Sequence, residues 1–290
     1  MARVIKTSPR CHQTVIGNTD TTRNATSLQR MPLETTLTHP SRAHAAPSHR
    51  LVTQWATDDK QILAAKRLRY RVFHDELGAH LSGGQPGLDQ DEFDAYCKHL
   101  IVSDNHTGEV VGTYRLLEPS AAKAIGCYYA DTEFDLTRLR NIKPQMAELG
   151  RSCVDPNYRT GAVIMAMWSE ILRYCVAQGH QYLLGCTTVP MRWDGGMLAH
   201  SLWSKLASNH LASEAFQVYP RKALPGLSRQ YDAPSPPALM QAYLRMGAKI
   251  LGKPAWDVDF CAADFPMLLN LENLPPRYQR GLKMLSRDCQ

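Results

Sequence analysis

The stretch from residue 145 to 188 constrains the fold more than any other part of the chain. It reads as a strand, an amphipathic helix and a second apolar strand, over residues 145–154, 160–178 and 182–188. The turn DPNYRTG joins the first strand to the helix, and Gly179 ends the helix. Strands and helices alternate in this way along most of the chain, which predicts one α/β domain layered around a mixed sheet.

The remaining elements are predicted from the same periodicities. Helices are expected over residues 58–77, 136–140, 197–206, 238–246 and 277–285. Strands are expected over residues 97–103, 110–117, 127–129 and 258–262. A loop rich in Gly and Asp fills residues 78–95.

Composition separates the first 50 residues from the rest. They hold seven Lys or Arg and two Asp or Glu, so they carry most of the net charge of +6. They are rich in Ser, Thr, Pro and His, which predicts a disordered basic tail over 1–50 and a globular domain over 51–290. The tail can contact acidic lipids or proteins, or can simply be solvated. The domain itself is nearly neutral, which gives little support to nucleic-acid binding.

Other patterns exclude several classes of protein. The eight cysteines form no C-x-x-C and the histidines form no H-E-x-x-H, so we expect no metal site. No apolar run reaches the roughly 18–20 residues that a membrane helix needs. Residues 1–50 lack the apolar core of a signal peptide. We therefore expect a cytoplasmic protein, with peripheral contact at the inner membrane as a further option.

The turn before the central helix is a candidate anion site. A strand that turns into a helix presents the free backbone N–H groups of the first helical turn to phosphate-like anions. Gly161 lets the backbone approach such a group closely, and Arg159 adds a positive charge. An ordinary turn is the alternative interpretation, because many strand–helix turns contain Arg and Gly.

Four short motifs follow one another in a recognisable order. They are RYRVF at 69–73, DQDEFD at 89–94, GTYRLL at 112–117 and ELGR at 148–151. Together they resemble the GNAT-superfamily acyltransferases that use acyl carrier protein, among them the acyl-homoserine-lactone synthases. The segment 236–265, PPALMQAYLRMGAKILGKPAWDVDFCAADF, resembles the ornithine lipid N-acyltransferases. The resemblance spans about residues 55–285 and implies a GNAT-like fold, with a central mixed, mostly antiparallel sheet flanked by helices.

The resemblance also implies a reaction. A 3-hydroxyacyl chain on the phosphopantetheine of acyl carrier protein would be moved to the α-amino group of L-ornithine, giving lyso-ornithine lipid, with no bound cofactor. Acylation of another amino acid or amine is an alternative, as is a non-catalytic protein that binds the carrier. A lactone synthase is a further option, which the segment 236–265 disfavours.

Glu148 is the candidate general base. The amine must lose a proton to attack a thioester, and a glutamate on a central strand is partly desolvated, which raises its pKa. The alternative is a structural ion pair with Arg151. Strict alternation would place the two on opposite faces, whereas a bulge at Gly150 would place both on one face. The resemblance favours the shared face, with Arg151 also in the catalytic site.

The acidic motif and its arginines form the predicted acceptor side. Asp91 and Asp94 can hold the cationic side chain of ornithine, or they can belong to a solvated acidic loop. Arg69 and Arg115 can clamp the α-carboxylate of the substrate or order the acidic loop by ion pairing. Phe73 is expected to pack under that loop.

The predicted donor side follows the same strand into the helix. The resemblance implies an oxyanion donor among the backbone N–H groups near Cys153 and Val154, and a pantetheine arm along Arg159, Gly161 and Ala162. A nucleophilic role for Cys153 is less favoured, because the sequence places no His partner beside it. Basic residues can dock the carrier, namely Arg192, Lys205, Arg221 and Lys222. The last helix, 277–285, can lie on anionic lipid or pack on the core.

Overall fold

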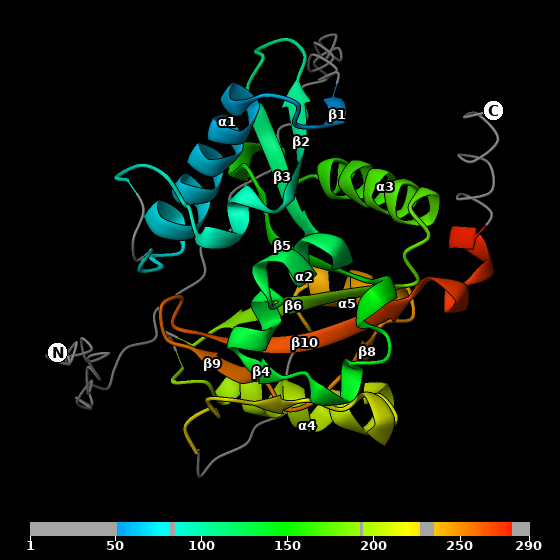
Figure 1. Cartoon of the computed structure of the whole chain (residues 1–290). Helices are drawn as coiled ribbons and strands as arrows, with labels where there is room; N and C mark the ends of the chain where they lie inside the picture. The colour runs from blue at the N-terminus through cyan, green and yellow to red at the C-terminus, as the bar shows by residue number, and fades with distance from the viewer. Residues whose placement is uncertain (1–50, 82–84, 192–193, 227–234, 280–290) are drawn as a thin grey trace, which may run out of the picture. The chain divides into compact units, whose positions relative to one another are not determined.

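An eight-stranded sheet organises the domain in the computed structural model, which describes residues 51–81, 85–191, 194–226 and 235–279 (Figure 1). Its strands run in the order β1-β2-β3-β5-β6-β10-β8, and β9 pairs with β10. They are β1 Leu51–Trp55, β2 Lys98–Asp104, β3 Val110–Leu117, β5 Met146–Val154, β6 Tyr182–Pro190, β8 Lys249–Ile250, β9 Ala255–Asp257 and β10 Ala262–Asn270. Among these strands only β5 and β6 pair in parallel, so the predicted mixed, mostly antiparallel sheet is confirmed.

In the described residues, five α-helices surround this sheet, together with a two-stranded sheet of β4 (Phe134–Asp135) and β7 (Tyr219–Pro220). The helices are α1 Asp59–Tyr70, α2 Pro119–Ile125, α3 Ala162–Ala177, α4 Met197–His210 and α5 Ala238–Arg245. The side chain of Asp58 caps α1 by accepting a hydrogen bond from the backbone N–H of Gln61 (2.9 Å). A π-helical turn, Arg71–Glu76, extends α1 toward the predicted end of this helix.

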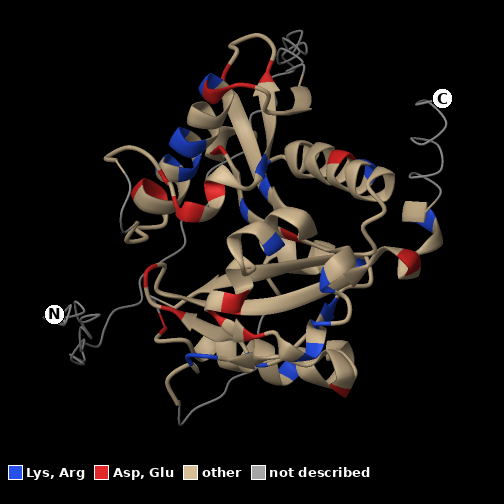
Figure 2. Cartoon of the chain, in the orientation of Figure 1, with Lys and Arg blue, Asp and Glu red and all other residues tan. Residues whose placement is uncertain are grey.

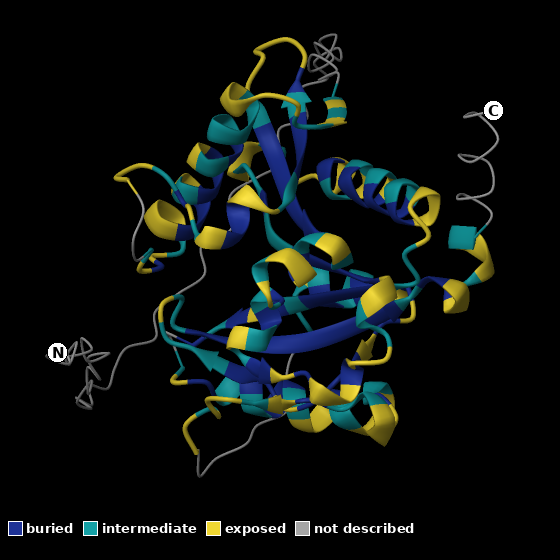
Figure 3. Cartoon of the chain, in the orientation of Figure 1, coloured by how far each residue is buried: buried dark blue, intermediate teal, exposed yellow. Residues whose placement is uncertain are grey.

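Helices α1 and α3 cover opposite faces of β3. The Tyr114 ring lies 6.1 Å from the Trp168 ring of α3, whereas the next residue, Arg115, points to the α1 side, because side chains alternate along a strand. A Cβ at Gly112 would lie 2.4 Å from Val163 on α3, so glycine is required where this helix approaches the strand. Figure 3 shows the result, with buried central strands and exposed outer faces on the helices.

The parting of β5 and β6 creates the opening that matters for function. The two strands pair from Met146↔Tyr182 to Leu149↔Gly185 and then separate, while β6 pairs with β10 along its full length. On the other edge of β5, Tyr114 faces two residues, Arg151 and Ser152, because Thr113 pairs with Cys153 and Arg115 with Gly150. This bulge lies one residue beyond the predicted position, Gly150, and it places Arg151 at a φ of 50°.

Two predicted strands are wrong. Residues 127–129 lead into a 3-10 helix, Tyr129–Thr132, because Asp131 accepts a hydrogen bond from the Tyr128 N–H. Residues 258–261 form a turn, in which the Asp257 carboxylate accepts hydrogen bonds from the N–H groups of Asp259 and Phe260. The true strand, β10, starts at Ala262 and contains Pro266, a residue that argues against a strand when only the sequence is read.

Three predictions concern segments with little or no described structure. The tail 1–50 lies outside the described residues, as does Arg192. The last predicted helix is described only as far as residue 279, where residues 276–279 are helical. Within the described ranges, no helix has both the length and the apolar character needed to cross a bilayer.

Candidate active site

A cavity of about 260 Å³ lies where β5 and β6 part. Its polar lining comes from both strands and their neighbours, with Glu148 and Arg151 on β5, Thr188 on β6 and Asp264 on β10. Its walls are largely apolar, and they include Phe73, Leu77, Phe93, Tyr114, Leu117, Tyr129, Leu239 and Phe260. An apolar cleft with a few polar groups is the usual form of a small-molecule site.

Glu148 is held at the floor of this cavity. Its side chain is nearly fully buried, and its two carboxylate oxygens accept hydrogen bonds from the N–H groups of Tyr129 and Ala130, both at 2.7 Å. Burial raises the pKa of Glu148 to about 7, against the opposing effects of these two amides and the charge of Arg115. A carboxylate with a pKa near neutrality is suited to accept a proton at physiological pH.

Arg151 lines the same cavity, so the bulge does place it on the face of Glu148. Glu148 and Arg151 interact with different partners. The Arg151 guanidinium lies 3.1 Å from an Asp91 oxygen and 3.4 Å from an Asp89 oxygen, and 5.1 Å from the centres of the Tyr129 and Phe260 rings. Because Glu148 is bound by backbone amides, the geometry does not support the alternative of a direct ion pair between Glu148 and Arg151.

The acidic motif is tied down by three arginines. Asp94 accepts hydrogen bonds from both Nη atoms of Arg69, at 2.8 and 2.9 Å, and Arg115 donates to Asp91 at 2.5 Å. Burial alone would raise the pKa of Asp94, but the hydrogen bond and charge of Arg69 and the charge of Arg115 hold it well below its usual value. Figure 2 shows basic residues along α1 and acidic residues on the turns that lie beside the C-terminal end of this helix.

This network shows one of the two roles considered for Arg69 and Arg115, while Arg115 also lines the cavity. They order the acidic loop, as one of the alternatives holds, and the charges of Asp91 and Asp94 are compensated within the protein. Neither carboxylate lines the cavity that contains Glu148. Phe73 does line it, and it packs edge-on against Phe260 with 5.6 Å between ring centres.

On the donor side of β5, one backbone N–H faces the opening. The Asp155 N–H donates to Val111 O on β3 (2.8 Å), and since amides alternate along a strand, the Val154 N–H points to the other edge, where β6 has moved away. Burial raises the pKa of the Cys153 thiol to about 12, so this group is a poor nucleophile at neutral pH.

The turn before α3 has its charge compensated as well. Arg159 forms a two-point ion pair with Glu76 (2.6 Å for both bonds) and donates to Val154 O, so its charge is already engaged. Gly161 begins the helix at a φ of 86° without a side-chain cap, which leaves the first-turn amides near Ala162 available to an anion.

Comparisons with known proteins agree with this geometry. Residues 68–169 match the model of the acetyltransferase (GNAT) domain family. The chain is 33% identical to the L-ornithine N(alpha)-acyltransferase of Rhodobacter capsulatus over 77% of its own length and 91% of the relative, and 33% identical to that of Brucella abortus over 79% and 87%. The chain belongs to the L-ornithine N(alpha)-acyltransferase family. It is therefore an acyltransferase, as predicted.

Solved structures are more distant from this member of the L-ornithine N(alpha)-acyltransferase family. The AHL synthase LasI is 13% identical, with a TM-score of 0.46 over 77% of this chain and 91% of that one. FeeM, an N-acyl amino acid synthase from uncultured soil microbes, is 10% identical, with a TM-score of 0.43 over 78% and 94%.

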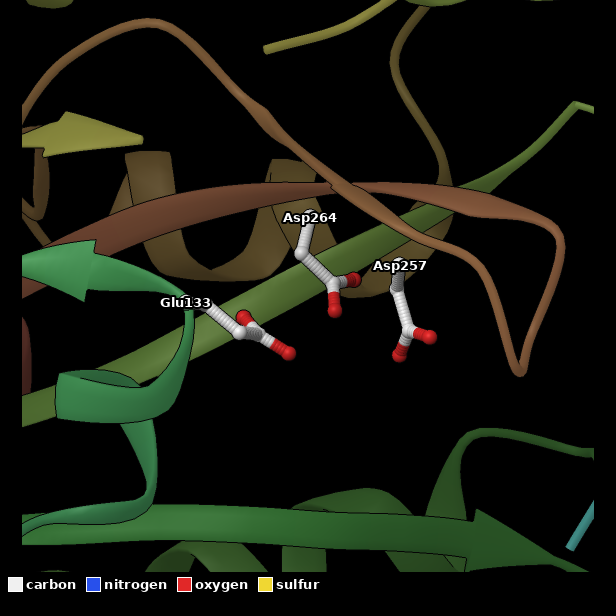
Figure 4. Close-up of side chains that lie close together, drawn as sticks. All are labelled: Glu133, Asp257 and Asp264. Atoms are coloured by element: carbon white, nitrogen blue, oxygen red, sulfur yellow. The ribbon is translucent and has the colours of Figure 1, made fainter. Parts of the chain in front are cut away.

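Sequence reasoning missed several residues of the cavity in this acyltransferase. Tyr129 supplies an amide to Glu148 and a ring to Arg151, and the Phe260 ring also lies against Arg151 in the cavity lining. Sequence reasoning also missed a cluster of three carboxylates, Glu133, Asp257 and Asp264, which bring one oxygen each within 4.8 Å of one another (Figure 4). The acidic composition of DTEFD and DVDFCAADF was a signal, but the two segments lie far apart in the sequence, and nothing local indicates that they meet.

Proposed function

We propose that this N-acyltransferase moves a 3-hydroxyacyl chain from acyl carrier protein to the α-amino group of L-ornithine and so makes lyso-ornithine lipid. The observation that carries the proposal is Glu148, a buried carboxylate with a pKa raised to about 7 at the floor of an apolar cavity. The names of the relatives supply the acceptor, and the apolar walls suit a fatty acyl chain.

The reaction needs one proton acceptor and one oxyanion donor. Glu148, directly or through a water molecule, takes a proton from the substrate ammonium, and the free amine attacks the thioester carbon. The tetrahedral oxyanion accepts a hydrogen bond from the Val154 N–H at the open edge of β5. A C–N bond forms, the C–S bond breaks, and the pantetheine sulfur leaves as a thiol with the second proton of the amine.

The donor arm would enter along β5 and α3. The amides at the start of α3, around Ala162, suit the phosphate of phosphopantetheine. Carrier docking would use basic residues outside the cavity, such as Lys222, which lies 4.4 Å over the Trp256 ring. Peripheral contact with the inner membrane would help release an amphiphilic product. Residues 51–290 would suffice for transfer, so a chain lacking 1–50 should keep its activity.

Glu148→Gln is the direct test. We expect kcat with ornithine and the acylated carrier to fall by about 10²–10⁴-fold, the usual contribution of a positioned base, while carrier binding is unchanged. The acid limb of the wild-type pH–rate profile, with a midpoint near pH 7, should disappear in the variant. Equal loss of turnover and carrier binding would show that Glu148 is only structural.

Lipid analysis tests the substrate assignment. The chain should be expressed in a bacterial host that makes no ornithine lipid, and its lipids should be analysed by mass spectrometry. A lipid with an N-linked 3-hydroxyacyl ornithine is the expected product. A different acyl-amino acid would keep the reaction and discard ornithine, whereas no new lipid despite soluble protein would favour a non-catalytic carrier-binding role.

A further inference from the structure

Two carboxylates that line the cavity, Asp257 and Asp264, meet a third, Glu133, at its edge. Asp264 comes from β10, Asp257 from the end of β9, and Glu133 from the segment before β4 (Figure 4). One oxygen from each carboxylate lies within 4.8 Å of the other two, and within the described ranges no Lys, Arg or His forms an ion pair with them. The field of Arg151 reaches Asp257 and Asp264, but this arginine is already held by Asp89 and Asp91.

Asp264 shows that the cluster is incomplete. Its side chain is 95% buried, since only 5% of its surface is exposed, and it lines the cavity. Its Oδ1 atom is buried and has no hydrogen-bond partner, although buried polar atoms in proteins are nearly always paired. The carboxylate points toward Glu133 and Asp257. Burial and the charge of Asp257 raise the pKa of Asp264, against the opposing hydrogen bonds to the side chains of Thr188 and Glu133 and the charge of Arg151. Burial and the two aspartates also raise the pKa of Glu133.

The sheet register places this cluster at a defined distance from the candidate base. Glu148 pairs with Leu184 on β6, and Asp264 pairs with Thr188 on the same strand. These two β6 positions share a face and are four residues apart, about 13 Å along a strand. Cys186 lies between them on that face and also lines the cavity. Side chains reaching inward from both ends leave room for a short substrate with a charged group at each end.

We propose that Glu133, Asp257 and Asp264 bind the side-chain ammonium of the amino-acid acceptor while its α-amine faces Glu148. This assignment rests on the proposed function, because it concerns the same cavity and the same reaction. A primary ammonium has three N–H donors and no acceptor, so it can donate to one oxygen from each of three carboxylates. The buried Oδ1 of Asp264 then gains a partner, and the selectivity for a diamino acid follows from charge and not from shape.

Asp264→Asn and Asp257→Asn test the assignment in the full-length protein. Transfer from a 3-hydroxyacyl carrier protein should be measured with L-ornithine and with L-norvaline, which has the same carbon chain but no side-chain ammonium. In each variant we expect kcat/KM for ornithine to fall by about 10–100-fold, the value of hydrogen bonds to a charged group. The value for norvaline should stay constant or rise. Glu272→Gln is the matched control, since it removes an exposed charge just beyond β10.

The outcomes separate the two proposals. If the wild-type protein acylates ornithine and only the cluster variants lose the preference for ornithine over norvaline, the assignment holds. If the variants fold and lose both substrates equally, the cluster is structural and the assignment is wrong. If wild-type transfer requires Mg²⁺ or Ca²⁺ and stops with EDTA, the cluster holds a metal instead. If the wild-type protein acylates no amino acid, the proposed function itself fails.

Discussion

Two groups of three carboxylates lie in this domain, and they differ in their counter-charges. Asp89, Asp91 and Asp94 are paired with three arginines, Arg69, Arg115 and Arg151. Among the described residues, no basic side chain forms an ion pair with Glu133, Asp257 or Asp264, and the Arg151 charge that acts on the two aspartates is already engaged. In the first group, the negative charges are balanced by arginines, and the ion pairs fix the shape of the site. In the second group, we propose that the substrate ammonium supplies the positive charge. A group of acidic residues beside a cavity is therefore a candidate site for a cationic ligand when no basic side chain of the protein is paired with it.

The largest expected effect comes from breaking the arginine-paired group. Asp94→Asn leaves the buried guanidinium of Arg69 with one compensating carboxylate, so the free energy of unfolding should fall by about 3–5 kcal/mol, the usual cost of removing one partner from a buried ion pair. Denaturant titration measures this loss. Glu92→Gln, an exposed neighbour, should change little. A loss below about 1 kcal/mol in Asp94→Asn would show that the two groups do not differ as described.

The same exchange in the second group should act in the opposite direction. Folding raises the pKa of Asp264 from its ordinary value of 3.8 to about 6, so its contribution to stability is full below 3.8 and lost as pH rises through 6. Asp264→Asn should therefore raise the free energy of unfolding at pH 8 by up to about 3 kcal/mol and flatten its decline between pH 4 and 6. Asp94 has a lowered pKa, so its contribution is lost instead as pH falls below 3.8. Unfolding measured across this range checks both signs.

The smallest change in the free energy of unfolding is expected at Asp91, the more exposed aspartate of the arginine-paired group. The Asp91 side chain is 20% exposed, more than that of Asp94. Asp91→Asn should lower the free energy of unfolding by only about 1 kcal/mol, because water partly replaces the lost charge. The same titration applies, with Asp94→Asn as the reference. If Asp91→Asn lost as much unfolding free energy as Asp94→Asn, the size of the loss would not depend on how deeply each aspartate is buried.

Much of the fold could be predicted because its elements follow simple periodicity. The strand 110–117 and the helix before Gly179 were found nearly to the residue, since each shows one clear pattern. Strand β10 was placed too early because Pro266 interrupts its pattern and the preceding turn is apolar. The bulge was displaced by one residue because glycine is the usual left-handed residue, whereas here Arg151 adopts that conformation.

The candidate site was predictable only in part, for a physical reason. Glu148 was identifiable because a charge in an apolar strand is unusual. Ion pairing of the acidic loop with Arg69 and Arg115 was one of two alternatives, and the part of Arg151 was missed, because compensation depends on three arginines brought together by α1, β3 and β5. The cluster around Asp264 joins residues more than 120 positions apart, and no local pattern reports a contact of that kind.

The sharing of Asp91 by Arg115 of β3 and Arg151 of β5 has a consequence for how the sheet assembles. A slip of one residue between these strands would turn one arginine to the opposite face. Asp91 and Asp94 would then be buried with too little positive charge, which makes the slipped pairing unfavourable. The network thus favours the correct register of β3 and β5. Glu148, the bulge at Arg151 and the open edge of β5 take their positions only in that register.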